Sequence, residues 1–163
     1  MTASAGSLVL ARILHVVGVV LWIGGVAFVT TVLIPALRRV PDGDERLRLF
    51  EALEGRFSVQ ARAVTLVTAL AGFYMLHGFG AWGRYQDPSF WWLHLMTFVW
   101  AVFTLVLFVL EPMFLHRWFR TFAERDSDRA FRLMHRLHVI LLTLSLLAIA
   151  GGVAGIRGFL RIG

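Results

Sequence analysis

The chain contains no cysteine and no lysine among its 163 residues. Without cysteine, it cannot form disulfides, thiolate metal sites or thiol redox centres. Charged residues are also scarce, at 16% of the chain, whereas hydrophobic residues make up 58%. Soluble domains average about 25% charged and about 45–50% apolar residues. Both departures indicate a membrane protein, and the length predicts a single domain over residues 1–163.

Long apolar runs account for most of the sequence. A bilayer core requires about 20 predominantly apolar residues in a helix. Four runs qualify, at about residues 8–33, 59–79, 90–114 and 137–160. We do not expect the first run to be a cleavable signal peptide, because it is too long and no basic segment precedes it. We therefore predict an all-α integral membrane four-helix bundle that lies in a lipid bilayer.

The arginines indicate how this bundle is oriented. Eleven of the sixteen lie in the two connections at residues 35–58 and 116–136, and four lie on the opposite side. The positive-inside rule therefore places both connections in the cytoplasm and both termini in the periplasm, if the membrane is a bacterial inner membrane. Membrane topology also explains the net charge of +6 without nucleic-acid binding. The connections show helical apolar spacing, so we expect them to extend the membrane helices.

Weak matches between the two halves suggest two tandem helical hairpins with pseudo-two-fold symmetry. His15 matches His94, and Pro35 matches Pro112 at nearly the same separation. Chance similarity among apolar helices is the alternative. If the duplication is real, the first and third spans lie diagonally across the bundle. His15 and His94 then lie at similar depth near the outer surface.

The six histidines fall into two groups. Three lie close to the predicted outer boundary: His15, His77 and His94. An ionisable side chain within a membrane span is costly and marks a functional candidate. The other three adjoin an arginine-rich connection, where we interpret them as interfacial anchors: His116, His135 and His138.

The outer histidines are candidate ligands of a haem iron. His15 shares one helix face with Gly18 and Trp22, and the glycine leaves room either for a flat macrocycle or for close helix packing. Adjacent helices are about 8–10 Å apart, whereas a diagonal pair leaves space for an iron between two imidazoles. We therefore predict His15 and His94 as axial ligands of a b-type haem. His77 is then a flanking residue or an alternative ligand.

Four further charged residues are assigned roles, either from the haem hypothesis or from their place at the span boundaries. Arg12 and Arg157 are candidate partners for a haem propionate, because a guanidinium binds a carboxylate in bidentate fashion. Interfacial anchoring is the alternative for both arginines. Near the opposite surface, Glu111 is predicted to form an ion pair with Arg62. No hydrolytic motif, phosphate loop or zinc motif is visible.

Copper is the alternative metal. Met75, His77, His94 and Met96 flank one short connection, and thioether and imidazole ligands both suit copper. However, residues two apart on a helix point about 200° away from each other, so neither Met–His pair can face one ion on a regular helix. Methionine also commonly fills gaps in packing.

The run LHVVGVVLWIGGVAF, in which His15 is followed by Trp-x-Gly, resembles the CopD-like and HemJ-like families of small bacterial membrane proteins. The resemblance covers the four-span layout. Similarity to HemJ implies b-type haem and oxidation of protoporphyrinogen, whereas similarity to CopD implies copper resistance or uptake. HemJ-like proteins carry a lysine in the third span, which this chain lacks. The resemblance therefore implies haem on His15 and leaves the reaction open.

The leading hypothesis is a dimeric or otherwise oligomeric membrane cytochrome b. It would carry out electron transfer or a haem-dependent oxidation near the periplasmic surface, with the quinone pool as a candidate redox partner. The alternatives are a copper-handling membrane protein and a structural protein whose histidines only pack. Gly151 and Gly155 would suit helix packing, either between subunits or within the chain.

Overall fold

The computed structural model describes residues 4–156, apart from the side chains of Leu115, His116 and Ile156. Four helical segments within this range are long and apolar enough to cross a membrane: Ala5–Leu37, Gly43–Gly78, Pro88–Phe114 and Ser127–Gly155. The predicted all-α membrane bundle is thereby confirmed.

The first helical hairpin consists of two long helical segments. The first segment comprises α1 (Ala5–Phe28), the π-helical η1 (Val29–Leu33) and α2 (Ile34–Leu37). The second is α3 (Gly43–Gly78), whose N-terminus is capped by Asp42 through a hydrogen bond from the Asp44 amide. At 36 residues, α3 is about 54 Å long, whereas a bilayer core is about 30 Å thick. The predicted helical extension beyond the apolar span is therefore confirmed for this connection.

The second hairpin begins after a sharp turn at Gly80, which has φ 58° and ends α3 in the left-handed conformation that glycine tolerates. Two 3₁₀ helices follow, η2 (Ala81–Gln86) and η3 (Pro88–Phe90). The chain then forms α4 (Trp91–Leu105), the π-helical η4 (Val106–Leu115), α5 (His116–Arg125) and α6 (Ser127–Ile156). The second arginine-rich connection is thus helical as well, as predicted.

Each hairpin contains a π-helical segment close to a proline. The segments begin at Val29 and Val106, which have the same separation in sequence as Pro35 and Pro112. Proline has no amide hydrogen and cannot continue the α-helical ladder, so a wider turn near it is expected. The local distortions therefore occur at matching places in the two halves of the chain.

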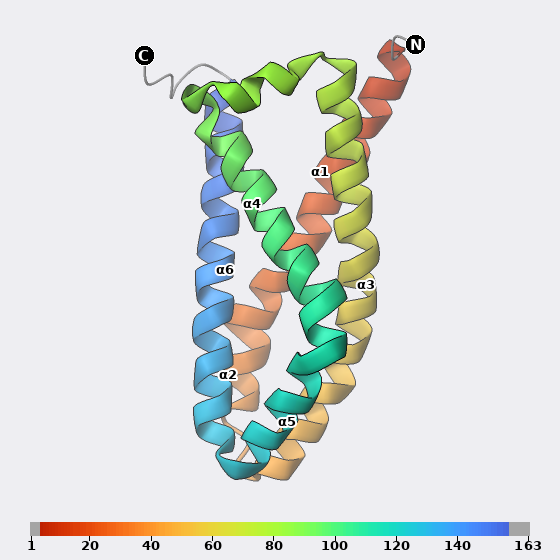
Figure 1. Ribbon diagram of the computed structural model, residues 1–163. Helices are drawn as coiled ribbons and strands as arrows, with labels where there is room; N and C mark the ends of the chain where they lie inside the picture. Colours follow the sequence, from red (N-terminus) through yellow and green to blue (C-terminus); the bar gives the residue numbers. More distant parts are fainter. Residues whose placement is uncertain (1–3, 157–163) are drawn as a thin grey trace.

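Figure 1 shows how the hairpins cross. Helix α1 packs along α3, and α4 packs along α6, whereas α1 and α4 cross between the two outer helices. We call the end where α1 begins and α6 ends the terminal end. The opposite end, where α2 leads to α3 and α5 to α6, is the arginine-rich end.

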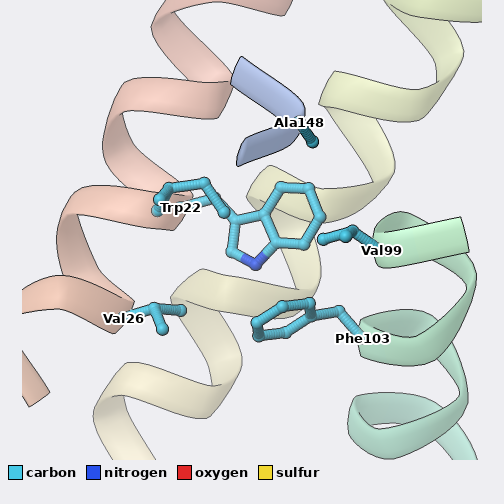
Figure 2. Close-up of a cluster of buried hydrophobic side chains, with 6 residues drawn as sticks. Trp22, Val26, Val99, Phe103 and Ala148 are labelled. Carbon is cyan, nitrogen blue, oxygen red and sulfur yellow. The ribbon is translucent and has the colours of Figure 1, made fainter. Parts of the chain in front are cut away.

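The core lies where α1 and α4 cross. Trp22 and Val26 of α1 meet Val99 and Phe103 of α4, with Ala148 of α6 closing the cluster (Figure 2). The rings of Trp22 and Phe103 pack edge to face, with their centroids 4.9 Å apart. Edge-to-face pairs of this kind stabilise a core beyond simple burial. The crossing point is therefore held by a buried cluster of apolar side chains from three helices.

Glycines permit close packing inside the second hairpin. A Cβ atom on Gly155 would lie 2.1 Å from the indole nitrogen of Trp92, and one on Gly151 would lie 2.6 Å from Trp91. A Cβ atom on Gly152 would lie 2.2 Å from the methyl group of Met96. Both predicted packing glycines thus serve contacts within the chain, where they receive the tryptophans of α4.

Candidate functional site

His15 is half-buried on α1 and its ring faces α3. Its Nδ1–H donates a hydrogen bond of 2.8 Å to the carbonyl oxygen of Thr68. The ring can approach α3 because Gly72 has no side chain, and a Cβ there would lie 3.1 Å from the ring atoms Nδ1 and Cε1. Since a carbonyl oxygen can only accept, Nδ1 carries the hydrogen and Nε2 is the remaining ligand atom.

This arrangement is the one that metal-binding histidines commonly use. A ligating imidazole usually donates its other ring N–H to a carbonyl or carboxylate, which fixes the tautomer and the ring orientation. Sequence analysis selected His15 for its depth in the span but missed Thr68 and Gly72. The sequence gives no indication of either residue. Thr68 acts through its backbone carbonyl oxygen, and Gly72 acts by having no side chain that would block the His15 ring.

His94 has a different environment, exposed in the first turn of α4. Its Nδ1 lies 3.1 Å from the Phe90 carbonyl oxygen, and its Nε2 lies 3.1 Å from the Tyr85 carbonyl oxygen. The Tyr85 ring also packs edge to face against the imidazole, at 5.5 Å between centroids. Both nitrogens therefore face backbone oxygens, and one contact must break before His94 can bind a metal ion.

His77 lies exposed in the last turn of α3 and makes no side-chain hydrogen bond within residues 4–156. Both of its ring nitrogens are available. It is placed one residue after the buried Leu76, on the side of α3 that faces away from the core. His77 can therefore bind a ligand without first losing an internal contact, although nothing in the described structure orients its ring.

The three outer histidines are not brought together by direct contacts. His15 contacts α3 of the first hairpin, whereas His94 contacts η2 and its own helix. At the terminal end, the first turns of α1 and of α4 lie on opposite sides of the bundle (Figure 1). Within residues 4–156, no group of three or more histidine, aspartate or glutamate side chains is arranged to hold a metal ion.

Two of the remaining predicted site residues on α1, Gly18 and Trp22, have structural partners. A Cβ on Gly18 would lie 2.2 Å from the hydroxyl oxygen of Thr68, so α3 already fills the space beside this glycine. Trp22 belongs to the central core. Arg12 is exposed, and no ion pair of this arginine is found among the described residues. Arg157 lies outside the described residues.

The methionines flanking the short connection do not form a clamp with the histidines. Met96 is half-buried, and its methyl group fills the space above Gly152 of α6. This contact explains Met96 as a packing residue. Met75 is half-buried on α3, one residue before the buried Leu76. The described contacts therefore add no support for a copper site at this connection.

The predicted ion pair at the other end of the bundle is confirmed. Arg62 Nη2 lies 3.2 Å from the carboxylate of Glu111, and the hydroxyl of Ser58 donates to the same carboxylate. Arg62 Nε–H also donates to the Leu107 carbonyl oxygen at 2.9 Å. In a π-helix this carbonyl would bond to the amide five residues later, which here is Pro112 and has no hydrogen. Arg62 therefore compensates for the distortion of η4.

Arg46 has a role that sequence analysis missed. It was counted only among the arginines that indicate orientation, yet it is buried at 5% exposure. Its guanidinium donates to the Val40 carbonyl oxygen, to Ser127 and to Asp128, and it lies over the Phe131 ring. Arg46 therefore ties the start of α3 to the start of α6.

Fold and contacts together define a multi-pass α-helical membrane protein. No family model, curated protein or solved structure matches the chain.

Proposed function

We propose that this protein is a membrane cytochrome that would hold b-type haem at the terminal end, with His15 as a ligand of the iron. The observation that carries the proposal is the hydrogen bond from His15 Nδ1–H to the Thr68 carbonyl oxygen. This hydrogen bond leaves Nε2 free and in a fixed orientation. A histidine within an apolar membrane helix is costly, which makes it a candidate for a functional role. When bound, the haem would supply one-electron chemistry, and the reaction would be electron transfer or a haem-dependent oxidation.

The chain offers two candidates for a second histidine that would hold the iron. His94 is the equivalent of His15 if the hairpins are duplicated, but its Nε2 must first leave the Tyr85 carbonyl oxygen. His77 needs no such change, because its ring makes no hydrogen bond among the described residues. Arg12 and Arg157 are the proposed propionate partners. Thr68 fills the space directly beside Gly18, so the haem would have to lie beyond this glycine.

The proposal includes an orientation in a bacterial inner membrane. Arginines are concentrated at the arginine-rich end, so this end is placed in the cytoplasm and the termini in the periplasm. The haem would then lie near the periplasmic surface, where the quinone pool or another redox protein could exchange electrons with it. A homodimer is part of the same proposal, although Gly151 and Gly155 are engaged within the chain.

The test is a reduced-minus-oxidised visible spectrum of the protein purified in detergent, together with metal analysis. We expect a six-coordinate haem spectrum in the wild type and its loss in His15→Ala. Loss in His94→Ala with retention in His77→Ala would identify His94 as the second ligand, and the opposite result would identify His77. Colourless protein with one copper per chain would refute the haem proposal and favour the copper-handling alternative.

A matched pair of glycine variants tests the orienting contact itself. A valine at Gly72 would collide with the His15 ring, because even a Cβ would lie 3.1 Å from it. A Cβ at Gly24, which lies exposed on α1, would meet nothing within 4 Å. We expect Gly72→Val to lower haem content and Gly24→Val to leave it unchanged. Equal haem content in the two variants would mean that the His15–Thr68 contact does not prepare the ligand.

A further inference from the structure

A second candidate site lies in the opposite half of the bundle, between the crossing point and the arginine-rich end. A cavity of about 170 Å³ opens there between α1, α3, η4 and α6. Most of its wall is apolar, but five polar side chains line it: Glu51, Glu54, Ser58, Glu111 and His138. An apolar pocket with a few convergent polar groups is the usual form of a small-molecule site.

The cavity is lined by more carboxylate groups than the nearby positive charge can balance. Glu111 pairs with Arg62, whose guanidinium is also bound to the Leu107 carbonyl oxygen. Glu51 and Glu54 have no ion-pair partner among the described residues. One carboxylate oxygen of Glu51 is buried without any hydrogen-bond partner. A buried charge without a partner is costly, so a cation at this position would stabilise the site.

An independent observation comes from the other end of the cavity. Trp22 is 5% exposed, and its indole nitrogen has no hydrogen-bond partner. Figure 2 shows this nitrogen on the side of the ring that faces Val26 and Phe103. Both of these residues line the cavity, as does Trp22. The indole N–H therefore lies on a side of the ring that borders the cavity and has no hydrogen-bond acceptor, which buried indoles normally have.

Both π-helical segments border the same cavity. Val29 and Leu33 of η1 line one side, and Leu107 and Glu111 of η4 line another. A π turn widens a helix, and such turns occur frequently at functional sites. The distortions that the two hairpins share therefore lie around a single space.

The size and the walls of the cavity select the ligand further. A cavity of about 150 Å³ can hold one benzene molecule, so this space accommodates one ring or a short chain. Aromatic side chains from three helices contribute to the wall: Phe57, Phe103 and Trp118. Aromatic faces attract organic cations. A bare metal ion is a poorer match, because no group of three or more ligating side chains is arranged around one within residues 4–156.

We propose that this cavity binds a small amphipathic amine whose far end carries a hydrogen-bond acceptor. The ammonium group lies between Glu51 and Glu54, which are three residues apart and share one face of α3. The apolar body lies along Phe57 and Phe103, and the acceptor receives the indole N–H of Trp22. This site is separate from the proposed haem position and does not depend on it.

The experiment measures equilibrium binding of labelled tyramine to the full chain, purified in a neutral maltoside detergent. Tyramine has an ammonium group and a hydroxyl at opposite ends of one ring. Phenethylamine lacks the hydroxyl, and 4-ethylphenol lacks the ammonium group, so both serve as competitors. We expect tyramine to bind with a dissociation constant of about 1 mM or less and to outcompete both analogues. No binding at that concentration, or equal competition by 4-ethylphenol, would overturn the proposal.

Variants connect the binding to the named residues. Glu54→Gln should weaken tyramine binding about tenfold or more, since the amide oxygen can still accept a hydrogen bond but no longer carries the charge that attracts the ammonium group. Glu54→Asp retains the charge and should stay within a few fold of the wild type. Glu45→Gln, at an exposed acid on the same helix, should bind normally. Trp22→Phe should abolish the preference for tyramine over phenethylamine while phenethylamine still binds. Unchanged affinity in Glu54→Gln, with circular dichroism matching the wild type, would refute the assignment.

Discussion

The contact between Gly18 and Thr68 decides how closely α1 approaches α3, and it can be tested by a single methyl group. In Gly18→Ala the new Cβ would lie 2.2 Å from the Thr68 hydroxyl oxygen and 3.6 Å from the Thr68 Cα. The helices must therefore separate or Thr68 must change rotamer, and overpacking of this kind costs about 1–3 kcal/mol.

The expected loss of stability in Gly18→Ala must be corrected for helix propensity. Replacing glycine by alanine within a helix stabilises it by about 1 kcal/mol, which would hide part of the steric cost. Gly24→Ala is the matched control, because Gly24 lies on the same helix and a Cβ there meets nothing within 4 Å. We therefore expect Gly18→Ala to be less stable than Gly24→Ala by about 1–3 kcal/mol.

Thr68→Ala should relieve the clash. The Thr68 hydroxyl donates only to the Val64 carbonyl oxygen of its own helix, so its removal alone should cost little. The double variant Gly18→Ala/Thr68→Ala should recover stability, with a coupling energy of about 1 kcal/mol or more. Unfolding in a mixed-detergent titration followed by circular dichroism provides the measurement. A Gly18→Ala variant as stable as Gly24→Ala, or a double variant without recovery, would refute the packing argument.

Two other predictions concern the arginine-rich end. Arg46→Met should destabilise the fold by about 1–3 kcal/mol, because it removes a buried guanidinium that bonds to a backbone carbonyl and two side chains. Arg48→Met, at an exposed position on the same helix, should have little effect in the same titration. For orientation, Gly83→Cys and Gly55→Cys place single thiols at exposed positions in a chain that has no cysteine. In intact spheroplasts, a membrane-impermeant maleimide should label the thiol at position 83 and not the one at position 55, and the reverse pattern would show that the orientation is inverted.

The helices were predictable because apolar runs of about 20 residues leave few alternatives. The extension of α3 down to Gly43 also followed from the apolar spacing of its charged region. The π-helical segments could not be predicted from the sequence, because a proline indicates that a helix is disturbed but not what form the disturbance takes. The role of Arg46 could not be predicted either, since its main partners belong to α6, about eighty residues away.

The candidate site was predictable only in part. His15 could be selected because an ionisable group in an apolar span is costly, but its hydrogen bond to Thr68 depends on the packing of two helices. The engagement of His94 with Tyr85 depends on the path of η2, which has no periodic pattern in the sequence. The sequence allows two alternative roles for Gly18, and its contact with Thr68 corresponds to close helix packing.

In the proposed cytochrome, Nε2 of His15 binds the iron of a b-type haem. Rescue of His15→Gly by added imidazole tests this assignment, because a free imidazole can take the place of the missing ring. We expect the reduced-minus-oxidised haem spectrum to be lost in His15→Gly and to return when imidazole is added. A wild-type spectrum in His15→Gly without imidazole, or a wild-type protein without haem, would contradict the claim.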